Sequence, residues 1–427
     1  MKLLRTKGRY YNQMINIKDY EDVVFPSDFL WGVSTAGQQI EGNNNSFYDD
    51  EETAPKKPGY VMAGKACNSY NMYEEDIQLI KAMHLNTYRM SLEWSRIEPV
   101  EGEFNQEAIE HYHKVLSSLK REGIKVALTL HHNSHPVWFE KKKAFHTMDN
   151  LDYWLRYVKL AVQEYDQYVD YYLTLNEINI VFEYSRDEGI NLLQYHAKAY
   201  QLIKQYSTKP VSLPLNYAQK QPMRAYDEAD QIMAQYIDYM EQGFFINAIR
   251  TGEIVVPEHD ALMIPELKDS VDFWAINVYI RQLINSRKKL FRFDHYNATH
   301  FHSSDEPFFS DEICPEVIYN ALHRLSDKPI LITENGIATT HDRYRIIYIA
   351  SMLQAIHQAM DEGVKVLGYF HWSLLDNWEW GSYMPKFGLA TYDHETYKRT
   401  LKKSGKFYGA IAKEGKLTQD IIQQFYK

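Results

Sequence analysis

Two glutamates of the chain occupy the same kind of local setting, at the end of an apolar, strand-like segment and beside an asparagine. Glu177 closes the segment LTLNE, and Glu334 lies in ILITENG. Two carboxyl groups facing one site can divide the work of glycoside cleavage: a protonated one delivers a proton to the leaving oxygen, and an ionised one attacks or stabilises the anomeric carbon. Either glutamate alone would more often cap a helix or join a salt bridge, so the hypothesis depends on the pair.

The separation of the two carboxyl groups would decide the stereochemical outcome. A distance of about 5–5.5 Å permits direct attack and net retention, whereas roughly 6.5–9.5 Å leaves room for a water molecule and gives inversion. The pattern of residues leaves this distance open.

The segments around these glutamates belong to a regular alternation of short apolar runs and longer runs of helical periodicity. The short runs predict eight strands, at residues 29–34, 87–94, 125–131, 171–177, 211–216, 273–279, 330–333 and 366–372. Between them, residues 106–122 and 343–362 repeat apolar side chains at helical spacing, and a glycine follows each. This alternation predicts an α/β fold, a single (β/α)8 TIM barrel with its active site at the C-terminal ends of the strands. A doubly wound open sheet is the alternative, but no glycine-rich phosphate loop follows the first strand.

In such a barrel, Glu177 and Glu334 end the fourth and seventh strands and face each other across the mouth. The other predicted strand ends also carry polar or aromatic side chains, namely Gln39, Glu41, Arg89, Trp94, His131, His132, Asn277, Tyr279 and Trp372. Amide, imidazole and carboxylate groups bind sugar hydroxyls, and flat aromatic faces pack against the apolar side of a sugar ring. Each of these residues taken singly could equally be structural.

The bulk properties exclude several other classes of protein. The chain has 427 residues, 45% hydrophobic and 24% charged, and a formal net charge of -10, without the basic face that nucleic-acid binding requires. Its two cysteines, Cys67 and Cys314, have neither paired spacing nor neighbouring histidine ligands, so neither disulfides nor a metal site are expected. No segment is long and apolar enough to be a secretory signal or to span a membrane.

We therefore expect a cytoplasmic protein with an N-terminal extension over residues 1–22 and one catalytic barrel over residues 23–427. The polar, histidine-rich stretch 285–311 is expected to be a mobile loop after the sixth strand. The oligomeric state is not predicted.

Taken in order, several long segments resemble glycoside hydrolase family 1, the β-glucosidase-like retaining enzymes. The similarity extends from Phe25 to Phe407 and includes FPSDFLWGVSTAGQQIEG, YRMSLEWSRIEP, LTLHHNSHPVWF, LTLNEIN, DFWAINVY, PILITENG and GYFHWSLLDNWEWGSYMPKFGL. The resemblance implies a TIM barrel acting by double displacement, without a cofactor. It also implies that Glu177 is the general acid/base and that Glu334 is the nucleophile.

The same resemblance implies the roles of the surrounding residues. Arg89, Asn176 and Tyr279 match positions near the nucleophile and the sugar 2-hydroxyl, while Gln39, His132, Trp372, Glu379 and Trp380 match positions that bind the non-reducing sugar. A carboxylate such as Glu379 would repel a 6-phosphate, so an unphosphorylated glycoside is expected, foremost a glucoside, with galactoside or fucoside as alternatives. Lys386 beside Phe387 is interpreted as structural or as positioning its loop.

The sequence departs from the family pattern at Asn133, Ile178 and residues 47–57, mainly on the side of the leaving group. Two other functions stay open at this point. One is a transglycosylase that uses the same two glutamates with a sugar or alcohol acceptor. The other is a non-catalytic sugar-binding barrel, which would be expected to have lost one of the two carboxylates.

Overall fold

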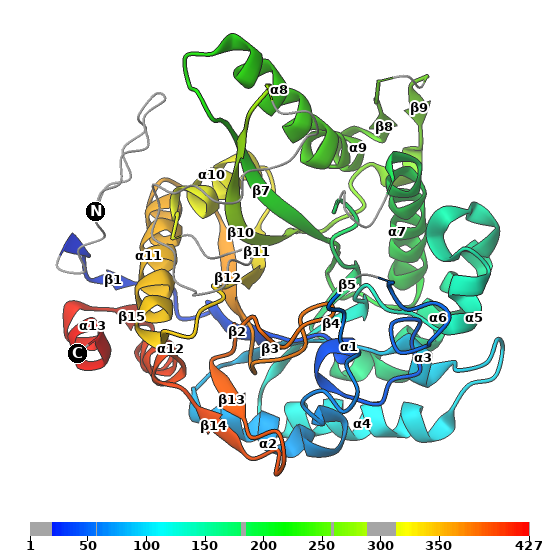
Figure 1. The fold of residues 1–427 in the computed structure, drawn as a ribbon, viewed down its shortest axis with the longest axis horizontal. Coiled ribbons are helices and arrows are strands. Elements are labelled where there is room, and N and C mark those ends of the chain that lie inside the picture. The colour runs from blue at the N-terminus through cyan, green and yellow to red at the C-terminus, as the bar shows by residue number, and fades with distance from the viewer. Residues whose placement is uncertain (1–18, 57, 181–184, 258–259, 288–312, 427) are drawn as a thin grey trace.

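The computed structural model describes residues 19–56, 58–180, 185–257, 260–287 and 313–426. At its centre is a sheet of parallel strands surrounded by helices (Figure 1). In spatial order the strands are β6 (Val211–Ser212), β5 (Tyr171–Leu175), β4 (Lys125–His131), β3 (Thr87–Ser91), β2 (Leu30–Ser34), β12 (Val366–Trp372), β11 (Ile330–Asn335), β10 (Trp274–Ile284) and β7 (Pro214–Pro222).

The two ends of this order belong to one strand. Only Leu213 separates β6, which pairs with β5, from β7, which pairs with β10. The nine strands therefore amount to eight barrel strands, because β6 and β7 count as one, and β12 pairs with β2 to complete the ring. The predicted (β/α)8 barrel is confirmed.

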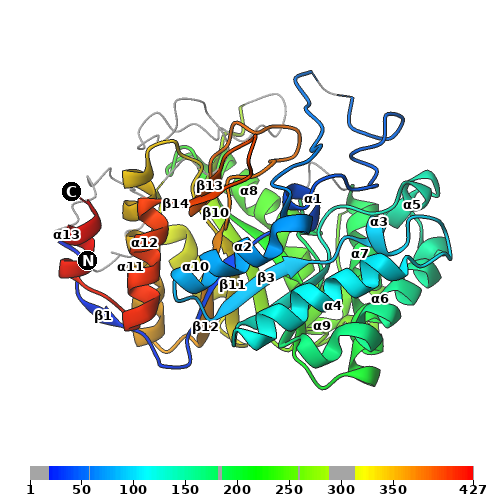
Figure 2. The same ribbon diagram turned by 90° about the horizontal axis from the view of Figure 1, so that it is seen from below.

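Helices cover the outside of the cylinder, and Figure 2 shows α2 and α4 lying across one side of it, with α12 upright beside α11. The main helices are α2 (Ser69–Ala82), α4 (Gln106–Arg121), α6 (Leu151–Tyr165), α7 (Arg186–Tyr206), α8 (Glu228–Asp238), α9 (Phe244–Thr251), α10 (Glu316–Arg324), α11 (Asp342–Asp361), α12 (Lys403–Glu414) and α13 (Gln419–Tyr426). Three short helices, α1 (Gly37–Ile40), α3 (Trp94–Ile97) and α5 (Val137–Lys141), follow the first three barrel strands. A five-residue π-helical turn, Tyr239–Gly243, joins α8 to α9.

The α4 helix illustrates how the sequence encodes these outer helices. Asn105 caps its first turn by accepting hydrogen bonds from two main-chain N–H groups, those of Glu107 and Ala108, at 3.0 and 3.3 Å. The apolar face predicted from the periodicity is buried, and Gly123 follows with φ +73°, a conformation that glycine adopts without strain. The predicted helices over 106–122 and 343–362 are thus confirmed as α4 and α11 to within one residue at each end.

The barrel interior below the catalytic face is packed with apolar side chains rather than open. Leu30, Leu173, Leu331 and Phe370 belong to one buried cluster there. A methyl group added to Gly32 would come within 2.2 Å of the Phe370 ring. Small and large residues on neighbouring strands therefore fit together and fill this part of the interior.

The strand predictions differ from the structure chiefly where a strand meets its functional loop. The strand predicted over 87–94 ends at Ser91, because Glu93 already caps α3. The strand predicted over 171–177 ends at Leu175, since Glu177 has a left-handed backbone with φ +51°. The strands predicted over 125–131 and 366–372 have the predicted bounds.

The remaining sequence-based expectations concern the ends and one loop. Residues 1–18 of the expected extension and residues 288–311 of the expected loop lie outside the described residues. Tyr20 is buried and hydrogen-bonds the Ser351 hydroxyl at 2.5 Å, and β1 (Val23–Val24) pairs with β15 (Lys416–Leu417), so the described residues before the barrel pack against it. Across the described residues, no helix is long and apolar enough to cross a membrane.

Candidate active site

Glu334 lies near the end of β11, buried in the mouth of the barrel. Its carboxylate forms an ion pair with the Arg89 guanidinium from β3, and the Tyr279 hydroxyl from β10 donates a hydrogen bond to it at 2.6 Å. Burial raises the pKa of Glu334, whereas the positive charge of Arg89 and the Tyr279 hydrogen bond act to lower that pKa. Arg89 and Tyr279 therefore offset part of the cost of holding an ionised Glu334 away from water.

Glu177 has a different environment. Its Oε1 accepts hydrogen bonds from the amides of Asn277, at 2.8 Å, and Asn216, at 3.1 Å. Burial, followed by the negative charge of Glu334, raises the pKa of Glu177 to about 8. Glu334 thus has a cation beside it, whereas the hydrogen bonds that the described residues donate to Glu177 come from neutral amides, so the surroundings favour an anion more at Glu334 than at Glu177.

Replacing Glu177 with glutamine is expected to stabilise the fold as the pH rises. The folded-state pKa of Glu177 is raised from 4.5 to about 8, so its carboxyl group binds a proton more tightly in the folded than in the unfolded chain. The stability that this binding contributes is present at low pH and is lost as the pH rises through the folded pKa. A neutral glutamine does not undergo this loss. At pH 8 it should therefore raise the free energy of unfolding relative to the wild type by about 2 kcal/mol or more.

Urea unfolding at pH 5 and pH 8 measures this effect. The free energy of unfolding of Glu177→Gln relative to the wild type should increase between the two pH values. The matched control is Glu110→Gln on the exposed face of α4. Its free energy of unfolding should differ little from that of the wild type at both pH values. A stability difference for Glu177→Gln that is the same at both pH values would contradict the cause assigned to the pKa.

Asn176 connects the two glutamates through hydrogen bonds. Its Oδ1 accepts from Arg89, at 2.7 Å, and from Asn277, at 3.1 Å, while its Nδ2 lies 3.2 Å from His132 Nε2. Asn277 is bound in turn by the Thr333 hydroxyl at 2.7 Å, directly before Glu334 in the chain. These amides hold the positions of Arg89 and Glu177 relative to each other and leave little freedom for either carboxyl group to move.

A third buried carboxylate, Glu379, belongs to a neighbouring group of polar side chains. It accepts hydrogen bonds from the Trp372 indole at 3.0 Å and from Gln39 Nε2 at 3.2 Å. Burial raises the pKa of Glu379 to about 8, and the negative charge of Glu334 acts in the same direction. Trp372 packs in one cluster with Tyr279, which donates to Glu334, so this group lies beside the two catalytic candidates.

The rings beside this group stand parallel. The His132 ring is 5.7 Å from the Trp372 ring and 6.1 Å from the Trp380 ring, with interplanar angles of 17° and 13°. His132 Nδ1 and Gln39 Oε1 are buried and have no hydrogen-bond partner among the described residues. Unpartnered buried polar atoms are costly, and hydroxyl groups of a ligand would satisfy them.

The structure thus brings together all the predicted catalytic and sugar-binding residues, from Gln39 on the first βα loop to Trp380 after the eighth strand. Three other strand-end residues have structural partners instead: Trp94 is stacked on Tyr157 in the core, His131 lies against His135, and Glu41 pairs with Arg96. Asn216 was missed as a site residue, although it ends the fifth predicted strand, where the other strands carry their polar groups. Among the described residues, no group of His, Cys, Asp and Glu side chains is arranged to hold a metal ion.

The sequence profile of glycosyl hydrolase family 1 matches residues 21–191 and 187–417. The chain belongs to glycosyl hydrolase family 1. It is 29% identical to β-glucosidase A of Thermotoga maritima, over 92% of this chain and 98% of the relative, and 28% identical to a 6-phospho-β-galactosidase of Staphylococcus epidermidis, over 91% and 98%. The structure of a β-glycosidase from Pyrococcus horikoshii matches with a TM-score of 0.84 at 32% identity and covers 95% of this chain and 99% of that one.

As a member of family 1, the protein is a glycoside hydrolase and a retaining β-glycosidase that binds small carbohydrate substrates. The comparisons favour neither the transglycosylase nor the non-catalytic barrel. Since the relatives include proteins named for phosphorylated and for unphosphorylated substrates, family 1 membership leaves the choice between those classes to the residues of the site.

Proposed function

We propose that this family 1 enzyme hydrolyses terminal, unphosphorylated β-D-glycosides, glucosides foremost, with Glu177 as the acid/base and Glu334 as the nucleophile. The observation that carries the assignment is the contrast between the two carboxyl groups. Arg89 and Tyr279 contact Glu334, whereas two neutral amides contact Glu177, whose pKa is raised to about 8. The first carboxyl is suited to be an anion and the second to hold a proton.

In the first step, a Glu334 oxygen bonds to the anomeric carbon as the bond to the glycosidic oxygen breaks. The Glu177 proton passes to that oxygen, and the leaving group departs as an alcohol or phenol. The product is an ester between the sugar and Glu334. Because this ester carries no negative charge, one of the two causes that raise the pKa of Glu177 disappears at this stage.

In the second step, the ionised Glu177 takes a proton from water as the water oxygen attacks the anomeric carbon. The ester bond breaks, Glu334 recovers its negative charge and Glu177 its proton, and two inversions give net retention. The charge of Glu334 therefore adjusts Glu177 to be an acid in one step and a base in the next.

The value of kcat/KM should fall on the alkaline side as Glu177 loses its proton. In the free enzyme this decline is expected as the pH rises through about 8, the raised pKa of Glu177. The measurement is kcat/KM for p-nitrophenyl β-D-glucoside between pH 4 and pH 10. In Glu177→Ala the alkaline decline of kcat/KM should disappear for a substrate whose leaving group needs no proton. If the decline persists in this variant, another residue causes it.

The surroundings of Glu379 support an unphosphorylated substrate. This buried carboxylate contacts only neutral partners among the described residues, the Trp372 indole and the amides of Gln39 and Asn377. A phosphate placed there would meet either this carboxylate or its protonated form, and neither carries the positive charge that a buried phosphate needs.

We therefore expect kcat/KM for an aryl β-6-phosphoglucoside to be at least about 100-fold below that for the aryl β-glucoside. The assay is a panel of aryl β-glucoside, galactoside, fucoside, mannoside and 6-phosphoglucoside. Glu379→Gln serves as the control, because it removes the repulsion without adding a cation and should narrow the difference only in part. Faster turnover of the phosphorylated substrate would rule out this substrate class.

Two narrower points complete the proposal. Water is the acceptor, and product analysis with and without an added alcohol separates hydrolysis from glycosyl transfer. The low cysteine content, two residues in 427, supports a reducing compartment, and we place the enzyme in the cytoplasm on that ground.

A further inference from the structure

Glu93 is a buried carboxylate that takes no part in the proposed reaction. It follows β3 and caps α3, where its Oε1 accepts hydrogen bonds from the main-chain N–H and the hydroxyl of Ser95, at 3.3 and 2.8 Å. Its Oε2 reaches a different loop and accepts from the Ser134 hydroxyl at 2.5 Å. Within the described part of the chain, no lysine or arginine forms an ion pair with it. A helix cap needs only one oxygen, so the second contact requires another explanation.

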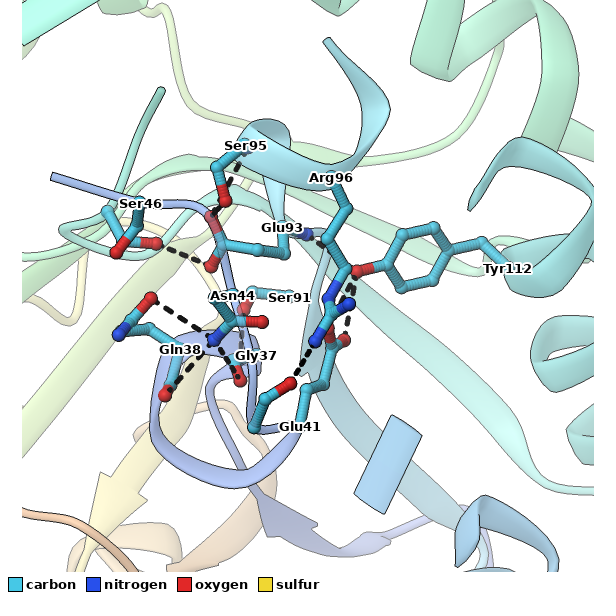
Figure 3. Close-up of polar contacts among 12 residues, drawn as sticks. Gly37, Gln38, Glu41, Asn44, Ser46, Ser91, Glu93, Ser95, Arg96 and Tyr112 are labelled. Atoms are coloured by element: carbon cyan, nitrogen blue, oxygen red, sulfur yellow. Dashed lines mark hydrogen bonds and ion pairs between the residues drawn. The ribbon is translucent and has the colours of Figure 1, made fainter. Parts of the chain in front are cut away.

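The main chain of Glu93 is fixed on its other side by a second network, drawn in Figure 3. Its N–H donates to the Tyr112 hydroxyl at 3.0 Å, and that hydroxyl donates to Glu41, at 2.9 Å to Oε1. Arg96 forms an ion pair with Glu41 at 2.7 Å. Glu41 stands two residues after Gln39, so this network joins Glu93 to the loop that carries one sugar-binding candidate.

The Ser134 contact joins Glu93 to the loop that carries a second sugar-binding candidate, His132. Ser134 is buried and stands two residues after His132, the ring with the unpartnered Nδ1. Between them Asn133 has a left-handed backbone with φ +59°, a conformation that a side chain other than glycine adopts only at some cost. A loop in such a conformation depends on its tertiary contacts to stay in place.

Burial of an ionisable carboxyl group that is matched only by hydroxyl and amide donors is unfavourable. Desolvation and the nearby charge of Glu41 raise the pKa of Glu93 to about 7. At a position without another role, an apolar residue would give a more stable fold than a buried carboxyl group. The contacts of Glu93 therefore indicate that it connects the loop of Glu41 with the loop of Ser134.

We propose that Glu93 is a positioning residue that ties the first and third βα loops together and so sets the distance between Gln39 and His132 in the sugar-binding site. This rests on the proposed function, since it takes these two side chains as ligands of the sugar hydroxyls. Glu93 itself touches no substrate and acts through Ser134 on one side and its own main chain on the other.

The test uses Glu93→Ala and Ser134→Ala, which remove the contact from opposite sides. Each should raise KM for p-nitrophenyl β-D-glucoside and the inhibition constant of free D-glucose about tenfold, with kcat changed by less than about threefold. The double variant should be no worse than the more affected single variant, because both remove one contact. Glu93→Gln should recover most of the affinity, since its amide can still span the gap by donating to Ser134.

Ser95→Ala is the matched control. It removes a hydroxyl from the same carboxylate, but on the helix that Glu93 caps, so it should leave the glucose inhibition constant within about twofold of the wild type. Thermal unfolding of all variants separates lost stability from lost affinity. If Glu93→Ala does not fold, Ser134→Ala, a single hydroxyl deletion, decides the matter.

Unchanged glucose inhibition in a folded Ser134→Ala would overturn the positioning role, as would an equal effect of Ser95→Ala. Additive losses in the double variant would do the same. A wild-type enzyme that turns over none of the aryl glycosides would instead overturn the proposed function and this inference with it, so the two failures are distinguishable.

Discussion

Glu334→Ala is expected to lower kcat/KM for p-nitrophenyl β-D-glucoside by on the order of 10⁵-fold or more, the scale of loss when a covalent nucleophile is removed. The reason is geometric. The Arg89 guanidinium and the Tyr279 hydroxyl both point at the Glu334 carboxylate, and alanine leaves them without the anion that they stabilise. Among the described residues, Arg89 forms an ion pair with no other carboxylate.

The cavity left by the Glu334 side chain should admit a small anion. Added azide would be held by the same cation and hydroxyl and would attack the anomeric carbon directly. A single displacement inverts the configuration, so the product should be the α-glucosyl azide, identified by NMR.

The matched control is Glu98→Gln. Glu98 is also a fully buried glutamate in an ion pair with an arginine, Arg156, but it lies outside the site. Its replacement should lower stability and leave kcat close to that of the wild type. Turnover by Glu334→Ala above about 1% of the wild type without added anion would reject the nucleophile assignment.

Glu177→Ala has the second largest expected effect, and its size should depend on the leaving group. For a substrate such as cellobiose, whose leaving alcohol requires a proton, kcat/KM should fall by about 10²–10⁴-fold, the range for loss of a general acid. For 2,4-dinitrophenyl β-D-glucoside, the phenolate leaves unaided, and the first step should be nearly unchanged.

The second step should then become rate-limiting for the activated substrate, because no base activates water. Stopped-flow kinetics should show a burst of dinitrophenol followed by slow turnover. Azide needs no base and should restore turnover by attacking the Glu334 ester, which gives the β-glucosyl azide. The two alanine variants should therefore yield azides of opposite configuration.

Glu177→Gln tests whether the proton or the shape of the side chain matters. Glutamine can keep the contacts with Asn277 and Asn216 but cannot transfer a proton. It should therefore resemble alanine in its dependence on the leaving group. Equal losses for all leaving groups in both variants would show that Glu177 is not the acid.

The amino-acid sequence was sufficient for the fold and for most of the site. Strands and helices follow from local periodicity, which is why β4, β12, α4 and α11 lie where the apolar pattern predicted them. In a barrel of alternating strands and helices, every strand ends at the same face, so residues at strand ends such as Glu177 and Glu334 had to meet there. The same reasoning located Arg89, Asn277 and Tyr279.

Only the tertiary structure decided the properties that depend on contacts between segments distant in the sequence. The pKa of Glu177 is set by burial and by Glu334, 157 positions further along the chain, and no local pattern encodes that proximity. The amide of Asn216 on Glu177 and the link from Glu93 to Ser134 arise in the same way, since each joins loops from different strands. Sequence periodicity specifies which face of an element is buried, but hydrogen bonds and charge interactions depend on ångström-scale distances that appear only once the cylinder has closed.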